Sequence, residues 1–170
     1  VVLVTGASGG IGAGIARAFA DEGAKVILHY FSNRAAIEQL QKELSHTETI
    51  IFQADLSKEA QVEKLFSQCI EQFGQIDSLI ANAGAWEMRD VPMHEMTLEQ
   101  WQQSMDDLVT APFLCLREFM KHMDQTKKGN AVVIGSTSAV FGEAGHADYA
   151  AAKSALAFGM TRTLKNELGR

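Results

Sequence analysis

Short runs of apolar residues alternate along the chain with longer segments in which apolar positions recur every three or four residues. The short runs have the length of buried strands, whereas the longer segments have the period of amphipathic helices. The predicted strands cover residues 1–4, 25–30, 49–54, 78–81 and 131–134. Because strands and helices alternate throughout, the pattern indicates repeated βαβ units, and hence an α/β fold with a parallel sheet flanked by helices.

The first three helical segments each mark one face as apolar. In the first, Ile11, Ile15, Ala18 and Phe19 recur at i, i+4, i+7 and i+8, so this face is expected to contact the sheet. The next two helices carry apolar stripes that we also expect to be buried: Ile37, Leu40 and Leu44, then Val62, Leu65, Phe66, Cys69, Ile70 and Phe73.

Two long helices are predicted in the second half of the chain. Thr97 is followed three residues later by Gln100, which is the spacing of a capping box at a helix N-terminus. A polar turn is predicted from Lys127 to Asn130. The last helix is predicted from about Tyr149 to Leu168 and is rich in alanine and glycine, so we expect it to pack closely against a neighbour.

Composition and charge narrow the class of protein. With 170 residues, 46% of them hydrophobic, the chain has the size of one domain with a substantial core. A net charge of −6 argues against a nucleic-acid partner, and no apolar run approaches the roughly 18 residues that a membrane span needs. Cys69 and Cys115 are expected to be reduced thiols of a cytoplasmic protein, and no histidine has the spacing of a metal ligand.

A glycine-rich turn joins the first predicted strand to the first helix. Rossmann-type doubly wound sheets bind the pyrophosphate of a dinucleotide at this place, because glycine lets backbone N–H groups approach the phosphates at the positive helix N-terminus. Taken alone, the turn is equally compatible with a plain connection between strand and helix. Its sequence is Thr5-Gly6-Ala7-Ser8-Gly9-Gly10-Ile11-Gly12.

The spacing of this turn, T-G-x-x-x-G-x-G, resembles the fingerprint of the short-chain dehydrogenase/reductase family. The resemblance implies that Asp55 and Leu56, after the third strand, contact the adenine, although Asp55 alone would also suit a helix cap. Where the family has N-N-A-G, this chain has Ala81-Asn82-Ala83-Gly84, which keeps the second Asn and lacks the first. The cofactor-binding residues that the resemblance implies are Thr5, Gly6, Ser8, Gly10, Ile11, Gly12, Asp55, Leu56, Asn82, Ala83 and Gly84.

Tyr149 and Lys153 are the candidates for acid-base chemistry. They are spaced i, i+4 and therefore share one face of the last helix. A nearby ammonium favours the ionised form of a phenol, which makes a tyrosine a more effective proton-transferring group. By itself this spacing is common on ordinary helix surfaces. In the family that the chain resembles, the same pair transfers the proton and holds the nicotinamide ribose.

A hydroxyl residue precedes this pair, as the resemblance requires. Ser136, Thr137 and Ser138 are adjacent after the fifth strand, and the family's spacing to Tyr149 selects Ser136. Its hydroxyl would hydrogen-bond the substrate oxygen as negative charge develops there. We therefore predict Ser136, Tyr149 and Lys153 as the catalytic residues.

Two features depart from the family pattern. The pattern W-x6-N-L after Trp101 would place an Asn at position 108, where this chain has Leu108. In the family that Asn is thought to bend the helix. The adjacent Asp107 could be a partial substitute, although an offset of one residue places it about 100° away around the helix. In addition, family members continue beyond this chain with another strand and a substrate-covering loop. We therefore expect residues 1–170 to form a single NAD(P)-binding domain truncated before those elements.

The end of the second strand favours NADP(H) over NAD(H). NAD-selective Rossmann domains usually place an acid there, and this chain has Tyr30 instead. Ser32 and Asn33 can donate hydrogen bonds to a ribose phosphate, and Arg34 can pair with it. Arg34 is equally compatible with a solvated position in the first turn of the next helix. Against this preference, Gly9 occupies a position that is basic in many NADP-dependent relatives.

The function predicted from these residues is hydride transfer between NAD(P)(H) and a small ketone or secondary alcohol. A nucleotide-binding sensor or scaffold that lost the chemistry is the alternative, for which Leu108 is the only hint. Family resemblance implies a homodimer or homotetramer through the last helix and the long helix that contains Leu114 and Phe119. Pocket-lining roles remain open for His146, Glu143, Trp86, Met88 and Arg89, with a plain polar loop favoured for His146.

Overall fold

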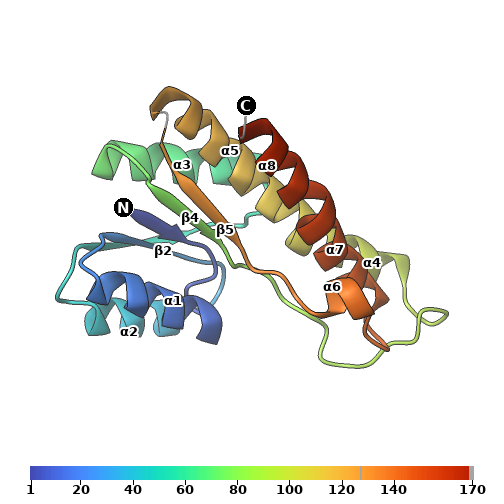
Figure 1. Ribbon diagram of the computed structural model, residues 1–170. Coiled ribbons are helices and arrows are strands. Elements are labelled where there is room, and N and C mark those ends of the chain that lie inside the picture. Colours follow the sequence, from blue (N-terminus) through green and yellow to red (C-terminus); the bar gives the residue numbers. More distant parts are fainter. Residues whose placement is uncertain (127, 169–170) are drawn as a thin grey trace.

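A five-stranded parallel sheet forms the centre of the computed structural model, which describes residues 1–126 and 128–168 (Figure 1). The strand order β3-β2-β1-β4-β5 confirms the doubly wound α/β prediction. All strands are parallel, and the order in which successive strands are added reverses between β1 and β4. Lys127, in the predicted polar turn, lies outside the described residues. The strands are β1 (Val2–Val4), β2 (Val26–Tyr30), β3 (Thr49–Gln53), β4 (Ser78–Ala81) and β5 (Asn130–Val133).

Helices cover both faces of the sheet, with α1 and α2 on one side and α3 and α5 on the other (Figure 1). Two segments, η1 and η2, are π-helical and interrupt the two long helices that the sequence predicts. In chain order the helical elements are α1 (Gly10–Asp21), α2 (Arg34–Glu43), α3 (Glu59–Phe73), α4 (Leu98–Met105), η1 (Asp106–Thr110), α5 (Ala111–Thr126), α6 (Ser138–Phe141), α7 (Ala147–Ser154), η2 (Ala155–Met160) and α8 (Thr161–Leu168).

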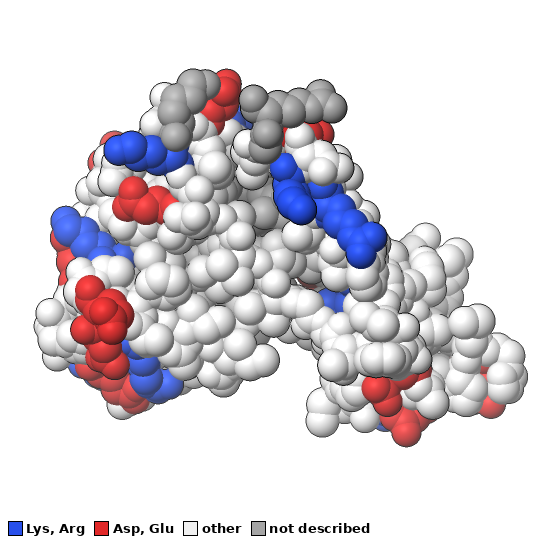
Figure 2. Space-filling view, viewed as in Figure 1, with Lys and Arg blue, Asp and Glu red and all other residues white. Residues whose placement is uncertain are grey.

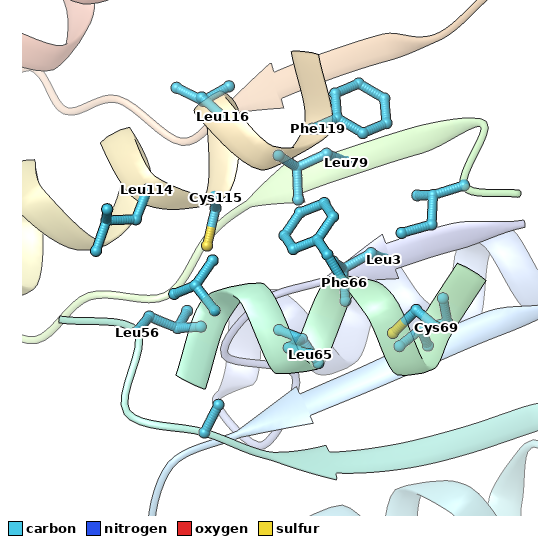
Figure 3. Packing of buried hydrophobic residues seen from close by; sticks show 14 of the residues in the cluster. Leu3, Leu56, Leu65, Phe66, Cys69, Leu79, Leu114, Cys115, Leu116 and Phe119 are labelled. Carbon is cyan, nitrogen blue, oxygen red and sulfur yellow. The ribbon is translucent and has the colours of Figure 1, made fainter. Parts of the chain in front are cut away.

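The larger core cluster lies between the sheet and the α3–α5 layer (Figure 3). Leu114 and Phe119 belong to it, so these two side chains of α5 face the core and cannot form an intermolecular surface. Cys69 and Cys115 are free thiols in the same cluster, and burial raises the pKa of each to about 12. Both thiols are therefore core residues, as the sequence predicted.

The buried face of α1 differs from the predicted one. Gly12, Ala16 and Ala20 contact the sheet, whereas Ile11 is 65% exposed and Ala18 is exposed as well. Small residues bring the helix backbone close to the strands, so the larger side chains are turned to the flanks. Ile15 and Phe19 of the predicted stripe are partly buried and pack against the core on this side of the sheet. The apolar period therefore identified the helix correctly and its inward face in part.

The long helix after Thr97 is broken by the π-helix η1. Thr97 caps α4 by accepting from the N–H of Gln100 at 3.1 Å, but the Gln100 side chain donates to Asp148 and does not complete a capping box. Pro112, in the first turn of α5, has no N–H to donate to the preceding turn. This missing donor is a physical cause of the irregular helix at Leu108.

His29, near the end of β2, connects the segments that follow the two neighbouring strands, β1 and β3. Its Nδ1 accepts from the N–H of Gly6 at 3.0 Å, and its Nε2 lies 3.0 Å from the carbonyl oxygen of Ala54. These two partners fix the tautomer, because only Nε2 can carry the hydrogen while Nδ1 accepts. Burial lowers the pKa of His29 from 6.5 to about 4. The neutral ring therefore holds the glycine turn after β1 against the segment after β3.

We predict that His29 makes the protein less stable in mild acid. Its folded-state pKa lies below the unfolded value, so the contribution is complete above pH 6.5 and is lost as the pH falls toward about 4, where the unfolded state binds a proton that the folded state excludes. The loss across this window is about 3 kcal/mol in free energy of unfolding. Denaturant melts at several pH values give the free energy of unfolding as a function of pH. This free energy should change less steeply with pH in His29→Asn, because asparagine cannot titrate. Equal slopes in both proteins would contradict the assignment.

Candidate functional site

A cleft of about 600 Å³ opens at the carboxyl ends of the strands. Figure 2 shows the hollow between the body that carries the sheet and a smaller lobe, with few charged side chains around it in this view. Its position at the reversal of strand order is where doubly wound sheets bind ligands. Of the predicted site residues, those that line it are Gly6, Ser8, Gly10, Ile11, Gly12, Asp55, Leu56, Asn82, Ala83, Gly84, Tyr149 and Lys153.

Two positions of the glycine turn, Gly6 and Gly12, have no room for a side chain. Gly6 has φ +65°, and a Cβ there would lie 2.8 Å from the Cα of Ala83. A Cβ at Gly12 would clash with the carbonyl oxygen of Gly6. The turn leads directly into α1, so its N-terminal amides and the positive end of the helix face the cleft. These features fit the pyrophosphate of a dinucleotide.

Thr5 acts behind the cleft, since it is 1% exposed and is not one of the lining residues. Its hydroxyl accepts from the backbone N–H groups of Asn82 and Ala83, each at 2.9 Å, and donates to the carbonyl oxygen of Ile80. In return, the Asn82 amide donates to the carbonyl oxygens of Thr5 and Gly6. The two turns that form the floor of the cleft are thus bonded to each other.

Asp55 forms a turn with Ser57 rather than the cap of α3, whose N-cap residue is Lys58. Its Oδ1 accepts from the N–H and the hydroxyl of Ser57, which fixes the turn before α3. Asp55, Leu56 and Ser57 also line the cleft, so this turn forms the wall at the end of β3. The arrangement fits an adenine contact at this end.

Tyr149 and Lys153 come from α7 and line the other end of the same cleft. The Lys153 Nζ lies 5.8 Å from the centre of the Tyr149 ring and donates to the carbonyl oxygen of Ile134 at 2.8 Å, which joins α7 to the end of β5. Lys153 is only 6% exposed, and this burial lowers its pKa. A positive charge held here acts through a medium that screens it less than water does.

Ser136 belongs to a hydroxyl cluster after β5 but is not one of the residues that line the cleft. Its Oγ is 3.0 Å from that of Ser138 and accepts from the Ser138 N–H at 3.2 Å. Ser138 is buried, and Thr137 is exposed at the start of α6. The structure therefore separates the three adjacent hydroxyls, with Ser138 supporting Ser136.

The helix that carries Tyr149 is anchored by a residue that sequence analysis missed. Asp148 is 1% exposed and accepts from the Ser104 hydroxyl at 2.6 Å, from Gln100 and from the N–H of Tyr149. Burial acts to raise its pKa, but these hydrogen bonds outweigh burial and hold the pKa below its usual range. The carboxylate thus fixes the first turn of α7 against α4, and its charge suits a helix N-terminus.

Leu108 lies in η1 and is buried beside the cleft. A Cβ on Gly84 would lie 2.7 Å from Leu108 Cδ2, so the leucine fills the space above the turn after β4. Gln103 and Asp107, joined by a 3.0 Å hydrogen bond, also line the cleft. The π-helix therefore supplies the helix irregularity without an asparagine, and it turns Asp107 toward the site.

Several residues lie elsewhere than the sequence suggested. Arg34 does not line the cleft; it is 76% exposed by side chain and pairs with Glu38 at 2.7 Å. Of the three pocket candidates in the loop after β4, only Trp86 lines the cleft, while Met88 and Arg89 do not. His146 is 2% exposed, so it is not a plain polar loop residue.

Phe31 and Ser32 line the cleft, whereas Asn33 does not. Sequence analysis gave Ser32 a role beside the ribose phosphate but gave Phe31 none. They directly follow β2, so the rule that ligands bind at the carboxyl ends of the strands would have found both. Within residues 1–126 and 128–168 there is no group of three or more His, Cys, Asp or Glu side chains placed to hold a metal ion. In the same part of the chain, no helix has the length and apolar character needed to cross a membrane.

Comparisons with known proteins agree with this arrangement. The chain matches the short chain dehydrogenase family model over residues 1–170. It is 36% identical over 170 residues to a 3-oxoacyl-[acyl-carrier-protein] reductase of Synechocystis sp., a match that covers 99% of the chain and 68% of the relative. It is 30% identical over 168 residues to the 3-oxoacyl-[acyl-carrier-protein] reductase FabG of Staphylococcus epidermidis, with 98% and 68% covered. The chain therefore belongs to the short-chain dehydrogenase/reductase family of NAD(P)-dependent oxidoreductases.

Proposed function

We propose that the protein transfers a hydride between NADP(H) and a ketone or secondary alcohol, with Ser136, Tyr149 and Lys153 as its catalytic residues. The observation that carries this proposal is a single cleft that has the glycine turn at one end and Tyr149 with Lys153 at the other. Both relatives have names that describe reduction of a 3-oxo group, which is a ketone. The substrate class proposed here includes that chemistry.

Each residue has a distinct task in this reaction. The nicotinamide cofactor, when bound, supplies or accepts the hydride. Tyr149 donates its phenolic proton to the carbonyl oxygen in reduction and takes a proton from the alcohol in oxidation. Ser136 donates a hydrogen bond to the same oxygen. Lys153, buried and held by Ile134, stabilises the negative charge on the phenolate and binds the ribose.

The alternative of a nucleotide sensor without chemistry has less support. It was suggested by Leu108, yet the π-helix η1 provides a bend at that position without the asparagine. The alternative gives no task to the hydroxyl of Tyr149, which lines the cleft next to the buried ammonium of Lys153.

We also propose that the protein forms a homodimer or homotetramer through the outer faces of α5 and α8. The groove there is lined by Phe113, Leu116, Met120, Met160 and Leu164, of which Leu116 is almost fully buried, and by the charged residues Arg117, Lys121, Asp124 and Glu167. Because Leu114 and Phe119 are in the core, the proposal uses the outer face of the long helix that carries them.

Replacing Tyr149 with phenylalanine should reduce turnover by ~10² or more, which is the range that general acid catalysis supplies. Cofactor affinity should stay within a few-fold, because the ring remains in place. Tyr30→Phe is the matched control, since Tyr30 is the other tyrosine and is buried in the core on the α1–α2 side of the sheet. Steady-state kinetics with a ketone and NADPH measure turnover, and cofactor fluorescence measures affinity. Unchanged turnover in Tyr149→Phe would refute its role.

Lys153→Met should reduce turnover to a similar extent and should also weaken cofactor binding. The reason is that one ammonium is proposed to stabilise the phenolate and to hold the ribose. Lys165→Met, at an exposed position on α8, is the control and should change neither quantity. A normal dissociation constant for NADPH in Lys153→Met would remove the ribose role while leaving the catalytic one open to the turnover assay.

The cofactor preference should depend on Arg34 and on its partner Glu38. We expect kcat/KM to be higher with NADPH than with NADH, and Arg34→Ala to reduce this ratio roughly 5- to 10-fold, as loss of a charge-assisted contact does. Glu38→Gln should raise the ratio, because it frees Arg34 from the 2.7 Å pair to bind a phosphate. A wild type that favours NADH would refute the preference. A ratio that neither variant changes would refute the role of Arg34.

A further inference from the structure

Two loops meet at the substrate end of the cleft. The N–H of Val91, in the loop after β4, donates to the carbonyl oxygen of Gly145, just before α7, at 2.9 Å. Gly145 has φ +79°, and a Cβ there would lie 2.8 Å from the Cα of Asp90. Only glycine suits both the conformation and the contact, so the two loops are held together at their backbones.

His146 fills the junction between these loops. Its side chain is 2% exposed, and its Nε2 lies 3.0 Å from Asp90 Oδ1. The ring is stacked on the indole of Trp86, with centroids 3.9 Å apart and planes 13° from parallel. Nδ1 has no hydrogen-bond partner among the described residues, so the ring is held mainly by the stack and by one bond to Asp90.

Trp86 connects this junction to the reacting centre. Its ring meets that of Tyr149 edge to face, with centroids 5.2 Å apart and planes at 84°. Trp86 lines the cleft and is 42% exposed. Because His146 and Tyr149 both contact the indole, the open indole face is the exposed part of the ring that lines the cleft. A flat, rigid, apolar surface therefore stands next to the proposed proton donor.

We propose that Trp86, supported by His146 and Asp90, determines specificity by selecting carbonyl substrates with a flat, apolar substituent next to the carbonyl group. An aryl or conjugated ketone could stack on the open indole face while its oxygen lies beside Tyr149. A puckered substituent of the same size cannot lie flat against that face and loses the stacking contact. This inference rests on the proposed hydride-transfer function.

The test compares acetophenone with cyclohexyl methyl ketone, which differ in flatness at nearly equal size. Binding of each ketone to the NADP⁺-loaded protein, which has no hydride to transfer, is followed by the indole resonances of the two tryptophans, assigned with Trp101→Phe. Acetophenone should bind about 3- to 10-fold more tightly and should shift the Trp86 resonance. Trp86→Leu should abolish the difference, and Trp86→Phe should keep part of it. Equal affinity of the two ketones, no binding of either, or a preference that survives in Trp86→Leu would overturn the inference.

The supporting role of His146 is tested by variants that separate its stack from its hydrogen bond. His146→Phe keeps a flat ring beneath Trp86 and should retain most of the preference, whereas His146→Ala should lose it. Met88→Leu, at an 85% exposed position in the same loop, is the control and should change nothing. If His146→Ala keeps the full preference, the support is refuted.

Turnover is measured separately from binding. A preference in binding without reduction of either ketone would refute the proposed function of the site and leave the selective surface standing. Reduction of both ketones at equal kcat/KM would refute the selective surface and leave the proposed function standing.

Discussion

The hydrogen bonds between Thr5 and Asn82 are the constraint on which the site depends. They join the ends of β1 and β4, the two parallel strands between which the strand order of the sheet reverses. A parallel sheet leaves a crevice at such a reversal, because the connections on the two sides lead to opposite faces. Here the crevice is fixed by five bonds made within two short turns, so the glycine turn cannot move without the loop after β4. His29 extends the same constraint to the end of β3.

Where strong local chemistry determines a feature, the sequence predicted it. The glycine turn, the strand ends and the i, i+4 pair Tyr149 and Lys153 follow from backbone sterics, apolar periodicity and helix geometry, and the structure brings them to one cleft. The inward face of α1 followed in this way only in part. Hydrophobicity favoured Ile11 as an inward residue, but close packing favoured Gly12 and Ala16. Small residues let the helix backbone pack directly against its neighbours, whereas an isoleucine at the contact would keep the helix farther away.

The parts that could not be predicted depend on contacts between distant residues. Asp148 is an ordinary acid at a helix N-terminus until Ser104, 44 positions away, donates a 2.6 Å hydrogen bond to it. His146 has no pattern of its own, and its partners Asp90 and Trp86 are more than 50 residues earlier in the chain.

The pairing of Arg34 with Glu38, in contrast, is a local contact at i, i+4 that could have been predicted from the sequence. The interpretation of Arg34 as a phosphate ligand overlooked this competing carboxylate.

Leu108 shows how a departure at one position is compatible with the chemistry of the site. The asparagine expected there is absent, but Pro112 removes a donor from the following turn and the helix is π-helical over Asp106–Thr110. The change in helical register turns Asp107 to the cleft, where Gln103 holds its carboxylate. Leu108 itself packs against Gly84, which has no side chain to resist it. The missing donor of Pro112 is thus one physical contribution to the π-helical backbone here, and Leu108 contributes an apolar side chain to the lining of the cleft.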